Sequence, residues 1–207
     1  DGPYKSFYEN GLLREELTFK NGELEGPYQV FFENRQLEEK GTFKNRLNDG
    51  PFELYYENGG LQSKGNYING KNVGLWKYYY ENGQLSLERT FDGEESGTLK
   101  SYYENGLLKE ELTFKDGVLE GLNKWYNENG EPKEEVNYKN GIKHGLFRTF
   151  RENGELKEEV NYKNDKKEGL LKYFYENGKL MREKTYKDGK EDGPYKEYYD
   201  NGQLSKE

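Results

Sequence analysis

Side chains that commonly carry catalysis or bind metals are scarce in this chain. His144 is the single histidine and there is no cysteine. Ser–His, Cys–His and zinc–thiolate arrangements therefore cannot be assembled within one chain. His144 stands in Lys143-His144-Gly145, and we expect it to be a solvated turn residue. Acidic residues hold the same position in other parts of the chain: Glu25, Asp49, Glu120 and Glu168.

Carboxylates are abundant, but their pattern is structural. Glu134-Glu135 and Glu158-Glu159 stand at one recurring position, where lysines are expected across the strand, so a solvated charged face is predicted. The glycines from Gly59 to Gly65 lack the Lys-Ser/Thr of a phosphate-binding loop and lie in a hairpin instead of before a helix. We therefore predict no catalytic residue, cofactor site or metal site, and no enzymatic activity.

The elements that would position any site recur with a fixed period of 24 residues, apart from one step of 23 residues that ends at Gly97. A residue is missing there before the Asp92-Gly93 turn. Such self-similarity indicates an array of supersecondary units. We predict a single array over residues 1–207, with about eight and a half repeats. The repeats begin at Gly2, Gly26, Gly50, Gly74, Gly97, Gly121, Gly145, Gly169 and Gly193.

Each repeat reads as a β-hairpin, with two strand-like segments around an Asn-Gly pair. Asn-Gly is the strongest short signal for a two-residue type I′ turn. The pair occurs at Asn10, Asn58, Asn82, Asn105, Asn129, Asn153, Asn177 and Asn201, and Asn34-Arg35 is the exception. A two-residue loop at Asn82-Gly83 predicts these cross-strand pairs: Glu81–Gln84, Tyr80–Leu85, Tyr79–Ser86, Lys77–Glu88 and Trp76–Arg89. Further turns, such as Asn69-Gly70, lead from one hairpin to the next.

This register gives the sheet two different faces. The apolar face carries Trp76, Tyr80, Leu85 and Phe91, with Phe91 opposite Gly74. The charged face carries Lys77, Glu88 and Thr90, together with an unbroken row of rings at Phe7, Phe31, Tyr55, Tyr79, Tyr102, Tyr126, Phe150, Phe174 and Tyr198. Asn127, Pro132 and Arg151 interrupt the rows of the apolar face, so a local bend or a different contact is expected there.

Composition limits the classes of partner. The chain is 31% hydrophobic and 35% charged, close to the composition of a disordered chain, but its 20 Tyr, 11 Phe and 2 Trp recur at fixed places. The net charge of -8 argues against nucleic acid and makes an anionic membrane surface an unfavourable partner. No apolar segment reaches the roughly 18 residues of a membrane-spanning helix. A reducing cytoplasm and a bacterial cell surface both fit the absence of cysteine, so the compartment stays open.

Together these features predict an all-β fold: an elongated, open-ended, single-layer antiparallel meander of hairpin repeats, twisted or curled. The repeat reads Gly-x-aromatic-x-x-aromatic-Tyr-Glu-Asn-Gly-x-Leu, followed by aromatic-Lys-Asn-Gly. In this form the whole chain resembles the bacterial variant of the MORN repeat. The resemblance implies a curled sheet with an aromatic-lined groove that binds proteins. Members of that family are often labelled as antitoxins of toxin–antitoxin pairs, and phospholipid binding has been proposed for some.

The predicted function is a non-enzymatic protein-binding or scaffold module with a partner of unknown identity. The expected contact residues are Tyr56, Trp76, Tyr78, Tyr80 and Tyr103. One alternative is an antitoxin that covers its toxin, and another is a surface stalk or spacer whose rings only pack against one another. Binding to a phospholipid surface is disfavoured by the acidic balance. Both a monomer and a homodimer formed through the apolar faces remain open.

Overall fold

The computed structural model describes residues 1–92 and 96–207, and these form two compact units, Asp1–Gly106 and Leu107–Glu207. Each unit is described by itself. Gly93 of the expected Asp92-Gly93 turn lies outside the described residues.

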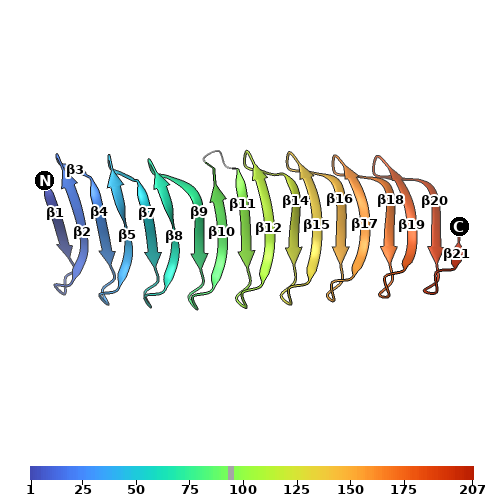
Figure 1. Cartoon of the computed structure of the whole chain (residues 1–207), viewed down its shortest axis with the longest axis horizontal. Coiled ribbons are helices and arrows are strands. Elements are labelled where there is room, and N and C mark those ends of the chain that lie inside the picture. Colours follow the sequence, from blue (N-terminus) through green and yellow to red (C-terminus); the bar gives the residue numbers. More distant parts are fainter. Residues whose placement is uncertain (93–95) are drawn as a thin grey trace. The chain divides into compact units, whose positions relative to one another are not determined.

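Both units consist of short antiparallel strands (Figure 1). The strands of the first unit are β1 (Gly2–Phe7), β2 (Leu13–Lys20), β3 (Glu23–Leu24), β4 (Gly26–Phe31), β5 (Leu37–Lys44), β6 (Leu47–Asn48), β7 (Gly50–Tyr55), β8 (Leu61–Ile68), β9 (Lys71–Tyr79), β10 (Leu85–Phe91) and β11 (Gly97–Tyr102). The strands of the second unit are β12 (Leu108–Lys115), β13 (Val118–Leu119), β14 (Gly121–Tyr126), β15 (Pro132–Lys139), β16 (Ile142–Phe150), β17 (Leu156–Lys163), β18 (Lys166–Phe174), β19 (Leu180–Lys187), β20 (Lys190–Tyr198) and β21 (Leu204–Lys206).

Within each unit the chain runs as a meander. In the first unit β2 pairs with β1 and β4, β5 with β4 and β7, and β9 with β8 and β10. In the second unit the same order runs from β14 to β20. The predicted all-β, open, single-layer meander is confirmed. The described residues include no helix that is long and apolar enough to cross a membrane.

The Asn-Gly loops differ from the prediction of a two-residue type I′ turn. At Asn82-Gly83 the Tyr80 N–H donates to the Gln84 carbonyl, and the Gly83 N–H donates to the Tyr80 carbonyl. The loop therefore has three residues, with Gly83 in the left-handed region at φ 84°. Arg35 replaces this glycine in one repeat and adopts the same conformation, at φ 73°.

Type I′ geometry is found at the second set of turns, which join one hairpin to the next. Asn69 and Gly70 both have positive φ, at 48° and 74°. The Asn164-Asp165 turn has φ values of 52° and 62° without any glycine. Asn and Asp tolerate this region better than other side chains, because their short polar groups bond locally.

A β-bulge restores the predicted register further along each hairpin. Leu85 pairs with Tyr79 and Leu87 pairs with Tyr78, so Ser86 is the extra residue. The predicted pairs Glu81–Gln84, Tyr80–Leu85 and Tyr79–Ser86 are therefore wrong. The longer loop takes Glu81 from the first strand and the bulge adds Ser86 to the second strand, so the two shifts cancel. The later predictions are therefore correct: Lys77–Glu88, Trp76–Arg89 and Gly74–Phe91.

The core of this single layer lies on the apolar face, where large side chains cover one another. Trp76 is only 2% exposed and packs on Phe52, Tyr67 and Tyr78, with ring-centroid distances of 5.7, 4.9 and 6.2 Å. A Cβ atom at Gly65 would overlap the indole ring. In the second unit Val160 and Leu171 fill the equivalent positions, and both are fully buried. The pair of Gly65 and Trp76 in the first unit is thus replaced by two aliphatic side chains in the second unit.

Candidate functional site: a groove on the charged face

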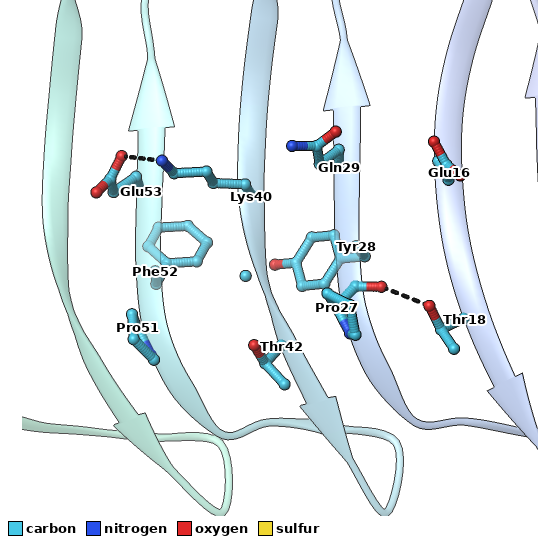
Figure 2. A pocket seen from close by; sticks show the side chains of 11 residues that line it. Glu16, Thr18, Pro27, Tyr28, Gln29, Lys40, Thr42, Pro51, Phe52 and Glu53 are labelled. Carbon is cyan, nitrogen blue, oxygen red and sulfur yellow. Dashed lines mark hydrogen bonds and ion pairs between the residues drawn. The ribbon is translucent and has the colours of Figure 1, made fainter. Parts of the chain in front are cut away.

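The candidate site is a groove of about 470 Å³ over β2, β4, β5 and β7 (Figure 2). Pro27 and Pro51 lie on it, and Gln29 and Lys40 lie farther along their strands. Because side chains alternate between the faces of a strand, these residues belong to the charged face. The full lining is Glu16, Thr18, Pro27, Tyr28, Gln29, Lys40, Gly41, Thr42, Pro51, Phe52 and Glu53. We call it the Pro groove.

Pro27 and Pro51 hold a repeat position on the charged face that carries a proline or leucine in every repeat except the one with Thr98. The residue that follows the first glycine of each repeat holds this position. In the described structure it is Pro3, Pro27, Pro51, Leu75, Thr98, Leu122, Leu146, Leu170 and Pro194, and all but Leu146 are exposed. Leu75, Leu122 and Leu170 are 48%, 43% and 39% exposed. Solvent-exposed apolar side chains therefore recur at one position of successive repeats. We call the residues at this position the Pro/Leu row.

Beside the Pro/Leu row runs a ladder of alternating charge. In the second unit each strand contributes one residue of opposite sign to its neighbours: Glu111, Lys124, Glu135, Arg148, Glu159, Lys172, Glu183 and Lys196. Arg148 contacts both Glu159 at 2.9 Å and Glu135 at 3.7 Å. Glu135 and Glu159 stand in this ladder opposite Lys124 and Arg148, as predicted for a charged face. Glu134 and Glu158 instead lie on the other face, paired with Trp125 and Tyr173.

The ladder is irregular at the Pro groove, because the neutral residue Gln29 stands between Glu16 and Lys40. Lys40 forms an ion pair with Glu53 at 2.8 Å, and Glu16 pairs with Lys5 at 3.2 Å. The hydrogen bond from Lys40 lowers the pKa of Glu53, and the same bond raises the pKa of Lys40. The charges at the groove are thus compensated within the protein.

The predicted contact residues occupy three different environments. Trp76 is buried in the apolar-face core, and Tyr78 is half-buried beside it. The hydroxyl groups of Tyr56 and Tyr80 donate to the backbone carbonyls of Tyr79 and Tyr102, at 2.7 Å each. These bonds link one repeat to the next. Tyr103 holds the position of Tyr80 in the following repeat and is half-buried.

The inter-repeat bond from tyrosine recurs where the row is intact. Tyr8 donates to the Phe31 carbonyl at 2.6 Å, and Tyr175 donates to the Tyr198 carbonyl at 2.7 Å. At the expected irregularity, Arg151 donates to the carbonyls of Phe174 and Leu156. A guanidinium group thus replaces the phenol, which confirms the predicted different contact.

At the opposite ends of the strands, acidic side chains link successive repeats. The carboxylate before a repeat's first glycine accepts a hydrogen bond from a backbone N–H in the turn 20 residues later. Donor and acceptor are Asn45 and Glu25 at 2.9 Å, Asn69 and Asp49 at 3.0 Å, Asn140 and Glu120 at 2.7 Å, and Asp188 and Glu168 at 2.9 Å.

His144 occupies this capping position, and its environment corrects the prediction of a solvated turn. It lies within β16, is half-buried, and has no hydrogen-bond partner at its buried Nδ1 atom. Here the direction of the link is reversed, because the Lys143 N–H donates to the Asp165 carboxylate at 2.8 Å. Asp165 is the second residue of the Asn164-Asp165 turn, a position that glycine holds in most repeats.

Among the described residues, no group of three or more His, Asp or Glu side chains is arranged to hold a metal ion. The surface features that recur are therefore the Pro/Leu row and the charge ladder. Their combination provides an apolar stripe beside compensated charges, which suits contact with a polypeptide.

Sequence comparison identifies the repeat. No curated protein matches the chain significantly. The family model described as the MORN repeat variant matches nearly its whole length, at residues 1–21, 24–45, 48–69, 72–92, 95–116, 119–140, 143–164, 167–188 and 191–207. These matches follow the hairpins described above, and the chain belongs to the MORN repeat variant family.

Proposed function

We propose that this chain is a non-enzymatic binding module that contacts another protein through its charged face. The observation that supports this proposal is the Pro/Leu row. Leu75, Leu122 and Leu170 expose large apolar side chains at one repeat position. Exposed apolar stripes bordered by polar groups mark interaction surfaces more often than isolated apolar residues do.

The apolar face supports binding less strongly, because its rings already pack on one another. The contact set Tyr56, Trp76, Tyr78, Tyr80 and Tyr103 therefore stays a prediction, and Tyr78 and Tyr103 are the residues with which it is tested below. Tyr56 and Tyr80 use their hydroxyl groups between repeats. A stalk or spacer would need neither face, whereas an antitoxin would be one special case of a protein-binding module.

A comparison of two folded variants tests this proposal. The charged-face variant carries Leu75→Gln, Leu122→Gln and Leu170→Gln, and the apolar-face variant carries Tyr78→Ser and Tyr103→Ser. Each is used with the unaltered chain for affinity capture from the source cell, followed by quantitative mass spectrometry. Circular dichroism and urea unfolding verify that both variants are folded.

We expect one stoichiometric protein that the charged-face variant no longer retains and the apolar-face variant still does. The reverse result would move the binding surface to the ring-bearing face. If neither variant nor the unaltered chain retains a stoichiometric protein, the spacer function replaces the proposed one.

A further inference from the structure

We infer that the Pro groove binds a proline-rich segment in the polyproline II conformation, which lies across the strands of the first unit. This inference rests on the proposed function as a protein-binding module and names the chemistry of the partner. Three properties of the groove support it: the spacing of its prolines, its unused hydrogen-bonding groups and its neutral charge.

The spacing matches the period of a polyproline II helix. Pro27 and Pro51 hold the same position in consecutive repeats, two strands apart in the sheet. Two strand spacings amount to about 9.6 Å. A polyproline II helix has three residues per turn and a rise of about 3.1 Å, so it presents the same edge every ~9.3 Å.

Other regular conformations fit this spacing less well. Side chains on one face of an extended strand recur every ~6.7 Å. One turn of an α-helix advances about 5.4 Å, and two turns advance about 10.8 Å. Leu75 stands one repeat beyond Pro51 in the same row, so that a longer polyproline II segment would meet a third apolar side chain after three further residues.

The polar groups of the groove also suit such a ligand. A polyproline II segment makes no internal hydrogen bonds, so its backbone carbonyls need donors. Within the part of the chain that the structure describes, no hydrogen bond uses the side-chain amide of Gln29 or the side-chain hydroxyl of Thr42. Both groups line the Pro groove and can donate. The Thr18 hydroxyl is already used, because it donates to the Pro27 carbonyl at 2.8 Å.

The charge of the groove is complementary to an uncharged segment. Glu16 is paired with Lys5, and Glu53 is paired with Lys40. A strongly acidic or basic ligand would have to compete with these ion pairs. Prolines bring no charge and no backbone N–H group, so the paired carboxylates would face no additional donor.

The test is binding of a fluorescently labelled nonaproline peptide to the full chain, measured by anisotropy. A glycine–serine peptide of equal length serves as the flexible control, and an Ala/Glu/Lys peptide serves as the helical control. We expect the nonaproline to bind at least tenfold more tightly than either control. Backbone chemical-shift changes on binding should centre on β4, β5 and β7.

A pair of matched variants locates the site. In the groove variant, Gln29→Ala and Thr42→Ala remove the two proposed donors. The control variant carries Lys172→Ala and Thr185→Ala, which stand at the same repeat positions in the second unit. We expect the groove variant to bind nonaproline about tenfold more weakly, as loss of hydrogen bonds worth about 1.4 kcal/mol would predict. The control variant should bind like the unaltered chain.

Equal binding of all peptides, shifts centred elsewhere, or no effect of the groove variant would overturn this inference. If the helical peptide bound the groove instead, the inference would fail while the proposed binding function stood. If no peptide bound but the charged-face variant lost its captured protein, the result would again refute only the proline-rich ligand. Absence of both kinds of binding would refute the proposed function as well.

Discussion

The indole ring of Trp76 lies over Gly65, which stands on the neighbouring strand β8, eleven residues earlier. The same separation relates Val160 to Leu171 in the second unit, where both partners are aliphatic and buried. The space above the strand is thus shared between two side chains. The indole ring of Trp76 leaves no room for a side chain at Gly65, whereas Leu171 leaves room for Val160.

The first prediction follows from this shared volume. Gly65→Ala should lower the free energy of unfolding by about 1–3 kcal/mol, because the new methyl group would overlap the indole ring. The double variant Gly65→Val, Trp76→Leu copies the Val160–Leu171 pair and should recover part of this loss. Urea unfolding measures both. If the double variant were less stable than Gly65→Ala, the pair would not be an interchangeable unit.

The second prediction concerns the bonds between repeats. Tyr80→Phe removes the hydrogen bond to the Tyr102 carbonyl and should cost about 1 kcal/mol of stability. Phe32 holds the same repeat position without a hydroxyl group, so that Phe32→Tyr should add a bond to the Tyr55 carbonyl and stabilise the chain. Thermal unfolding followed by circular dichroism measures both changes.

Tyr78→Phe is the matched control for these variants, since no hydrogen bond within the described residues uses the Tyr78 hydroxyl. It should leave the melting temperature nearly unchanged. A loss as large as that of Tyr80→Phe would mean that the inter-repeat bond has no special importance.

The third prediction concerns the reversed link at His144. The single variant His144→Glu should destabilise, because its new carboxylate would approach Asp165. Asp165→Gly should also destabilise, because the Lys143 N–H loses its acceptor. The double variant restores the arrangement of Glu120 and Asn140, so its loss should be smaller than the sum of the two single losses. A double-mutant cycle by urea unfolding measures this coupling, and strict additivity would contradict it.

The fourth prediction concerns alkaline pH. Burial raises the pKa of Tyr28, and a hydrogen bond to the Glu39 carboxylate adds to this effect. Burial also raises the pKa of Tyr67 and of Tyr78. Because the folded chain then keeps protons that the unfolded chain releases, stability should be constant below about pH 10 and fall above it.

For Tyr28 alone the slope approaches about 1.4 kcal/mol per pH unit. Urea unfolding between pH 8 and pH 11 measures this loss, with absorbance of tyrosinate as a second observable. Tyr28→Phe should flatten the curve, and an unchanged slope would show that Tyr28 does not control it.

The fold and most cross-strand pairs could be predicted from the sequence. The loop at Asn82-Gly83 is one residue longer than predicted, but the β-bulge at Ser86 restores the predicted register. The Asn82-Gly83 pair fits both a two-residue and a three-residue loop, since Gly83 can supply a left-handed conformation in either. Nothing in the residue types marks Ser86 as the bulge. The pair Lys77–Glu88 was nevertheless predicted correctly, because the additional loop residue, Glu81, comes from the first strand and the bulged residue lies on the second strand, so that the two shifts cancel.

The candidate site was predictable only in part. The charged face and its Lys–Glu pairs follow from strict alternation along each strand. The groove depends on Pro27, Pro51 and Gln29, and their exposure could not be deduced from residue types alone. Trp76 was expected at a partner surface because it is large and aromatic, whereas its burial depends on the absence of a side chain at Gly65, on another strand.

The side-chain links between repeats also bear on how such a chain can change length. Excision of residues 26–49 would join Glu25 to Gly50. Glu25 could then cap the turn at Asn69, as Asp49 does. Tyr8 would face the Tyr55 carbonyl in place of the Phe31 carbonyl. Because each link reaches only the adjacent repeat, a gene could gain or lose whole repeats through unequal crossing-over without needing compensating substitutions at the new junction.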